Sequence, residues 1–231
     1  MIGLVIKNLR LRNLNIALVF TIIFLFGFNM SSILDFTNNM VMYFPLYALI
    51  SIPEIVLYGD EEGMKEIKFV QERRKVKKFF IWLGMKVVFF TMLMTCVAFA
   101  FLSFSDTSFR QGVGYETYLI HVLSASMLVG AIGLLSAVIF RNRGAVYAVG
   151  FLFWIYWNIH FDHLSPLNPF LFIANPIDCL EWIPLQWGLI VLLLSLTCWL
   201  NTKTPYFLKE LVDHTKQVLT EQFLNGALRK R

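Results

Sequence analysis

The sequence predicts an all-α, polytopic membrane protein with six transmembrane helices and with both chain ends on the cytoplasmic side. Three observations lead to this fold class. Hydrophobic residues make up 58% of the 231 positions, which is more than one soluble core of this size can bury. The apolar residues form long unbroken runs, and the positive charges collect in alternate gaps between those runs.

Each apolar run is close to the roughly 20 residues that a helix needs to cross a bilayer. Backbone groups cannot stay unpaired in hydrocarbon, so a spanning segment must be a helix or part of a closed barrel. The runs lack the strict alternation of barrel strands, which favours helices. The predicted spans cover residues 16–34, 40–58, 79–104, 117–140, 144–161 and 184–202, within a transmembrane domain over 15–202.

The charge distribution predicts the orientation. The N-terminal segment, the second loop, the fourth loop and the C-terminal tail carry nearly all Lys and Arg residues. The three alternate loops together hold one positive residue, Arg110. Because cationic loops stay in the cytoplasm during insertion, the predicted location is the plasma membrane with both ends inside. The net charge of +5 fits this bias and contact with anionic lipid, so we expect no nucleic-acid partner.

The elements before the third span follow from local patterns. Residues 1–14 have apolar positions at helical spacing and predict an amphipathic helix in the headgroup plane. A short outer loop is expected around residues 35–39. The second span contains Pro45 and Pro53, each of which removes one helical hydrogen bond and favours a kink.

The second loop is the most charged part of the chain and predicts a short cytoplasmic helix over about 59–73. Acidic residues from Asp60 to Glu66 precede a basic run over 73–78, an order that suits a helix dipole. Met64, Ile67 and Val70 are three residues apart and would form a narrow apolar face. The alternative is a solvated charged loop that only obeys the positive-inside rule.

The later elements show three further patterns. The fourth span contains small residues spaced by four, Ser126 with Gly130 and Gly133 with Ala137, which predict close helix packing. The segment 164–183 is proline-rich around a short apolar core, and this predicts a re-entrant or surface-lying segment on the outer leaflet. Residues 203–231 carry a helical apolar stripe after Thr204-Pro205, which predicts a cytoplasmic amphipathic tail.

Two charged residues fall inside predicted spans. Lys86 lies near the inner interface of the third span, and Glu54 lies about one turn inside the same surface on the second span. An intramembrane Glu54–Lys86 ion pair is therefore expected. A structural role at the interface and a role in handling substrate or protons both remain open.

The sequence offers little support for chemistry on this chain. His160 and His163 are spaced for a metal, but no thiolate accompanies them, so no metal site is expected. A Glu61-Glu62 pair invites comparison with CAAX-type intramembrane proteases, yet the pair lies on the opposite side of the membrane from the histidines. Groups on opposite faces cannot form one general-base site. No GxxxxGK[ST] phosphate loop occurs, so the chain is not itself an ATPase.

The overall layout resembles the type-2 permease family of ABC exporters. The resemblance depends on the amphipathic start, six spans with both ends inside and a charged helical loop after the second span. Its local motif is the acidic stretch at 60–62, Gly63 with Glu66, the apolar residues Ile67 and Val70, and Lys86 early in the third span. Gln71 or Glu72 stands where that family usually has a proline.

The resemblance implies a permease subunit that binds no cofactor, with ATP and magnesium on a separate ATPase chain. It implies a coupling helix in which Gly63, Met64, Glu66, Ile67 and Val70 contact that ATPase. A second permease chain, identical or different, would complete the transporter. The short outer loops and the apolar spans suggest export of an amphipathic or hydrophobic cargo, such as a peptide toxin, bacteriocin or drug. A glycan exporter, a CAAX-type protease and an immunity protein are the alternatives.

Overall fold

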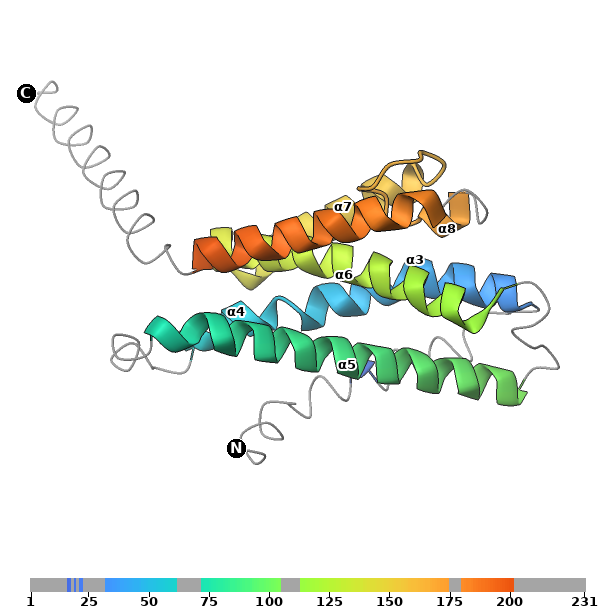
Figure 1. Cartoon of the computed structure of the whole chain (residues 1–231), viewed down its shortest axis with the longest axis horizontal. Coiled ribbons are helices and arrows are strands. Elements are labelled where there is room, and N and C mark those ends of the chain that lie inside the picture. The colour runs from blue at the N-terminus through green and yellow to red at the C-terminus, as the bar shows by residue number, and fades with distance from the viewer. Residues whose placement is uncertain are drawn as a thin grey trace, which may run out of the picture.

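The computed structural model describes residues 16–17, 19, 21–22, 32–61, 72–104, 113–174 and 180–201. This part of the chain is helical and contains no strand. Its elements are α3 (Ile33–Ser51), α4 (Glu54–Glu61), α5 (Glu72–Phe104), α6 (Tyr115–Phe140), α7 (Arg143–Ile159), the short α8 (Leu171–Ala174) and a last helix, Leu180–Asn201. Figure 1 shows the long helices side by side along one axis, with successive helices running in opposite directions.

Four of the described helices are long and apolar enough to cross a membrane. They cover Ile33–Leu57, Phe79–Phe104, Tyr115–Phe140 and Leu180–Asn201. The 17-residue α7 lies against α6 and is shorter. The helical character of the predicted membrane fold is thus confirmed, and four of the described helices are candidate spans. The predicted interface helix 1–14 and tail 203–231 lie outside the described residues.

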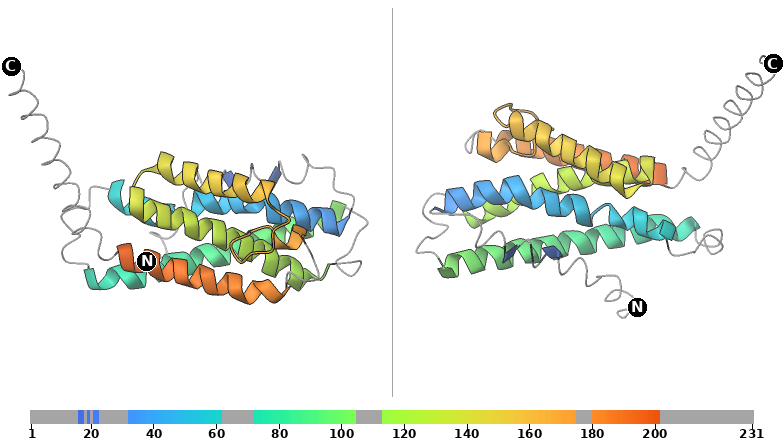
Figure 2. Two further views of the ribbon diagram at one scale, coloured as in Figure 1. Left: turned by 90° about the horizontal axis from the view of Figure 1, so that it is seen from above. Right: turned by 180° about the vertical axis from the view of Figure 1, so that it is seen from behind.

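The centre of the bundle is formed by α3, α4 and α6. In the most apolar windows of Ile33–Leu57 and Tyr115–Phe140, 72% and 78% of residues are buried, against 28% and 22% in Phe79–Phe104 and Leu180–Asn201. The two peripheral helices therefore present apolar side chains outward, as lipid-facing helices do. The left view in Figure 2 shows α6 between α7 and the last helix.

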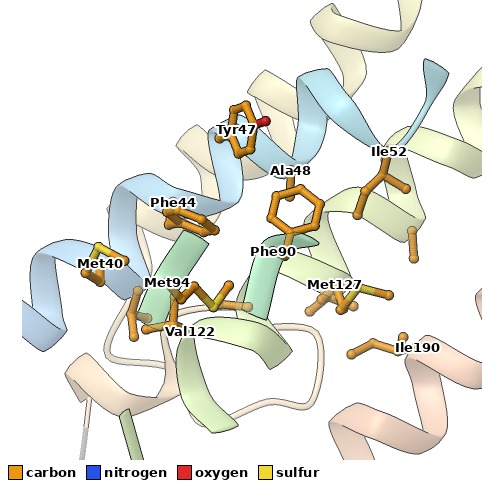
Figure 3. Packing of buried hydrophobic residues seen from close by; sticks show 14 of the residues in the cluster. Met40, Phe44, Tyr47, Ala48, Ile52, Phe90, Met94, Val122, Met127 and Ile190 are labelled. Carbon is orange, nitrogen blue, oxygen red and sulfur yellow. The ribbon is translucent and has the colours of Figure 1, made fainter. Parts of the chain in front are cut away.

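The core between α3, α5 and α6 is built from aromatic and sulfur-containing side chains. The Phe90 ring makes edge contacts with Phe44, at 5.8 Å between centroids, and with Tyr47, at 5.4 Å. Met94 and Met127 are buried beside them (Figure 3). Edge-to-face pairs stabilise by more than their buried area alone, so these rings hold α5 against the central helices.

The start of α3 differs from the sequence prediction. Residues 35–39 were expected to form an outer loop, but they form the first turns of α3. The Ser32 hydroxyl accepts a hydrogen bond from the Asp35 backbone N–H at 3.1 Å and donates one to the Asp35 carboxylate at 2.7 Å. This Ser-x-x-Asp cap starts the helix, and the acidic side chain suits its positive end. The polar residues here are thus a capped helix end.

The two prolines of the second predicted span behave differently. Pro45 lies inside α3, whereas Pro53 lies at the break between α3 and α4. Pro53 has no N–H, so the Leu49 carbonyl loses its helical donor. Hydrogen bonding resumes with the Ile55 N–H, which donates to the Ile52 carbonyl at 3.1 Å. The central span is therefore a helix broken near its cytoplasm-facing end in the predicted orientation.

Close packing at the centre depends on three glycines that admit side chains from α3 and the break. Ile52 fills the space in front of Gly130, and Leu49 lies against both Gly133 and Gly150. A Cβ at Gly133 would also meet Pro53 Cγ at 2.9 Å. Without side chains on these glycines, α6 and α7 approach α3 closely, as small residues allow in membranes.

Candidate functional site

A cluster of polar side chains lies at the break between α3 and α4. Ser51 is the last residue of α3, Glu54 is the first residue of α4, and Lys86 comes from the facing helix α5. The Lys86 ammonium donates a hydrogen bond to the Ser51 hydroxyl, with 2.8 Å between Nζ and Oγ. Tyr47, one turn before Ser51, lies within hydrogen-bonding reach of the Ser51 side chain. We refer to these four residues as the break cluster.

The break cluster is shielded from the surroundings. Tyr47 and Ser51 are each 1% exposed and Glu54 is 6% exposed, while Lys86 is half-buried. The Glu54 carboxylate acts electrostatically on both Lys86 and Tyr47. Such interactions are stronger here than in water because the effective dielectric constant is lower. The cluster thus holds opposite charges within a mainly apolar core.

The depth of the break cluster follows from the helix geometry. Lys86 comes seven residues after Phe79, where the apolar part of α5 begins. At 1.5 Å per residue this places it about 10 Å along a span, in a hydrocarbon core about 30 Å thick. Charges at such depth are costly and usually serve a site or a pathway.

The predicted residues Glu54 and Lys86 are brought to the same cluster, and the structure adds two partners. The direct hydrogen bond from Lys86 goes to Ser51, which the sequence analysis did not single out. Ser51 and Glu54 are three residues apart, as are residues on one face of a helix, and this spacing was the available signal. Tyr47 precedes Ser51 by one turn and could have been found in the same way.

The residues predicted to contact an ATPase, Gly63, Met64, Glu66, Ile67 and Val70, lie outside the described residues. The described chain ends at Glu61 on one side of this segment and resumes at Glu72 on the other. Figure 1 shows the end of α4 and the start of α5 at the same end of the bundle. The segment 62–71 therefore joins α4, which carries Glu54, to α5, which carries Lys86.

The predicted packing residues of the fourth span all lie on the buried side of α6. Gly130 and Gly133 receive Ile52, Leu49 and Pro53, as described above. Ser126 and Ala137 are buried, and the Ser126 hydroxyl donates to the Val122 carbonyl within its own helix. The packing partners of α6 at Gly130 and Gly133 are therefore α3 and the break itself.

A second polar network lies at the opposite end of the bundle. The Asn168 side-chain amide donates to the carbonyls of Phe161 and His163 at 2.9 and 2.7 Å, and its oxygen accepts from the Phe170 N–H at 2.8 Å. Gln186 of the last helix donates to the Asn168 carbonyl at 2.8 Å and accepts from the Ser124 hydroxyl of α6. Sequence reasoning missed this network because its members are far apart in the chain.

The histidines occupy two kinds of surroundings in the described part of the chain. His160 and His163 stack with ring centroids 5.9 Å apart, and His160 Nδ1 lies 2.9 Å from the Tyr156 carbonyl oxygen. His121 is instead buried on α6 against Phe172, at 4.8 Å between centroids. No group of three or more possible metal ligands occurs among the residues that the structure describes.

No family model, no curated protein and no solved structure matches this chain.

Proposed function

We propose that this chain is the permease subunit of an ATP-driven exporter in the plasma membrane, working with a separate ABC ATPase and a second permease chain. The observation that carries the proposal is the break cluster. It lies where a central membrane helix is interrupted, and the shorter half, α4, leads directly into the charged segment 62–71.

The arrangement suits the transmission of motion from the cytoplasm. The segment 62–71 is joined to α4 on one side and to α5 on the other, so a force on it acts on both. At the break, Lys86 of α5 is bonded to Ser51 of α3, while Glu54 of α4 attracts the same ammonium. A movement of α4 would move Glu54 relative to Lys86 and so change the balance between the Ser51 and Glu54 contacts of the Lys86 ammonium. A two-state mechanism requires such a difference in interactions between its states.

The positive charges within and directly after the segment 62–71 support a cytoplasmic position for it. ATP binding by the partner would then move this segment and rock the helices between inward-facing and outward-facing states. The exposed apolar surfaces and the aromatic-rich core suit an amphipathic or hydrophobic cargo, such as a peptide toxin, bacteriocin or drug. A glycan exporter would use the same transmission and differ in cargo.

The proposal requires a partner ABC ATPase, and the test is co-purification of this chain with an ABC ATPase from the same cell. We expect a stable complex whose ATPase activity responds to the permease. Glu66→Arg and Ile67→Asp should each abolish the complex at unchanged expression, because they alter the predicted contact face. Glu116→Arg, at the opposite end of the bundle, is the matched control and should leave the complex intact. Retention of the complex and of ATPase stimulation in both segment variants would refute the proposal.

A further inference from the structure

In the segment 161–174, between α7 and the last helix, three consecutive apolar residues pack into the end of the bundle, and we call these three residues the wedge. Phe170, Leu171 and Phe172 are buried, with exposures of 0%, 1% and 2%. Phe170 meets Trp154 of α7 edge-on at 6.3 Å between centroids, and Phe172 lies against His121 of α6. The short helix α8, which contains the last two of these residues, also contacts α3. The wedge therefore touches three helices at once.

The backbone of this segment is held in shape by one side chain. The carboxamide of Asn168 satisfies the carbonyls of Phe161 and His163 and the N–H of Phe170. Asn168 is itself fully buried. Because the three backbone groups share one internal partner, the segment can keep their hydrogen bonds if it moves as a unit.

The attachment of the segment to the bundle is polar and narrow. Gln186 donates to the Asn168 carbonyl and accepts from Ser124, so one carboxamide links the segment, the last helix and α6. Gln186 and Ser124 are 2% and 0% exposed. If the segment moved out of its packed position, the Gln186 amide and the Asn168 carbonyl would lose each other as partners unless water reached them, and an unmade buried hydrogen bond is costly.

We propose that segment 161–174 is a plug that closes the outer end of the helix bundle and moves out of its packed position during the transport cycle. We call Gln186 the latch, because its side chain holds the plug in that position. The proposal deepens the proposed function and depends on it for the last step. Figure 1 shows this segment at the end of the bundle opposite the end of α4 and the start of α5. With the charged segment inside, the plug faces outside, where an exporter must open.

The experiment measures the accessibility of a cysteine in the plug. Cys96, Cys179 and Cys198 are first replaced by alanine, and Leu171→Cys is then labelled on intact cells with a membrane-impermeant maleimide. We expect slow labelling, because Leu171 is buried. Leu167→Cys in the same segment is the matched control and should label rapidly, because Leu167 is 43% exposed. Equal rates at the two positions would overturn the seated plug.

The latch is tested in the same background. Gln186→Met retains the side-chain length and removes both hydrogen bonds, of which the one to Asn168 reaches the plug. We expect it to speed Leu171→Cys labelling by about two- to tenfold, the effect of losing one hydrogen bond of ordinary strength. Ser124→Ala removes only one hydroxyl and should give a smaller increase. Leu185→Met, which faces outward on the same helix, should have no effect. Unchanged protection in Gln186→Met would overturn the latch.

The gating step is tested by co-expression with the active partner ATPase or with a variant that cannot hydrolyse ATP. Faster Leu171→Cys labelling with the active ATPase supports gating, and equal labelling with both overturns it. The protection and latch measurements need no ATPase. They therefore remain informative if the complex itself fails to form, so failure of the proposed function and failure of the plug are distinguishable.

Discussion

The contact of Leu49 with two glycines predicts that Gly150→Ala destabilises the protein. A Cβ at Gly150 would overlap the Leu49 Cδ atoms and would lie 2.9 Å from Leu49 Cγ. Leu49 cannot simply turn away, because it also fills the space in front of Gly133, where a Cβ would meet Leu49 Cδ1 at 2.8 Å. Leu49 is 4% exposed, so no solvent-facing space is open to it. The added methyl group therefore forces α7 away from α3.

The size of the effect follows from overpacking. Extra methyl groups in a well-packed core cost about 1–3 kcal/mol. The intrinsic helix preference of Ala over Gly opposes this by at most about 1 kcal/mol. Since the clash involves the Leu49 stem as well as its methyl groups, we expect a net loss of about 1–2 kcal/mol in unfolding free energy, or roughly a 5- to 30-fold change in the folded-to-unfolded ratio.

The assay is reversible unfolding of the purified chain in mixed detergent micelles, followed by circular dichroism. Gly84→Ala on α5 is the matched control, since nothing lies within 4 Å of a Cβ placed there. It should be neutral or stabilising by up to about 1 kcal/mol. Leu49→Ala should restore part of the loss in the Gly150→Ala background. If Gly150→Ala were as stable as Gly84→Ala, the close approach of α3 and α7 would be wrong.

Two further predictions concern polar contacts and use the same unfolding assay. Lys86→Met should destabilise more than the double variant Lys86→Met/Glu54→Gln, because the single change leaves a buried carboxylate without its neighbouring cation. We expect a coupling free energy of about 1.5–3 kcal/mol between the two positions. Additive effects of the two single changes would argue against the break cluster. Trp154→Phe should cost about 1 kcal/mol by removing the 2.7 Å hydrogen bond from the indole N–H to the Met42 carbonyl. Leu152→Met, on the exposed side of α7, should be nearly neutral, and equal effects of the two changes would contradict this α3–α7 contact.

The sequence predicts those features of the fold that depend on local pattern. The apolar run at 117–140 corresponds to α6, and the run at 79–104 lies within α5, because unbroken hydrophobicity over about 20 residues permits little else. The boundary at 35–39 was wrong because polarity was taken as a loop, although the Ser32-x-x-Asp35 pattern is a helix-start signal.

The candidate sites also divide into residues that local sequence patterns could place and residues that they could not. Glu54 and Lys86 could be placed near each other because each depth can be counted from the inner surface. Ser51 and Tyr47 were not singled out, although their helical spacing before Glu54 was a usable signal. The network of Ser124, Asn168 and Gln186 was beyond sequence reasoning, since its members are separated by 18 to 62 residues and join through a side chain and a backbone carbonyl. Hydropathy carries no information about such pairings.

The most direct test of the account is the side of the membrane from which each end of the bundle can be labelled. Lys77→Cys, exposed near the start of α5, and Leu164→Cys, exposed in the segment after α7, are compared in a cysteine-free background with an impermeant maleimide. We predict that Leu164→Cys labels in intact cells and Lys77→Cys labels only in inverted vesicles. Labelling of Lys77→Cys from outside intact cells would place the charged segment away from any cytoplasmic ATPase and contradict the proposed function.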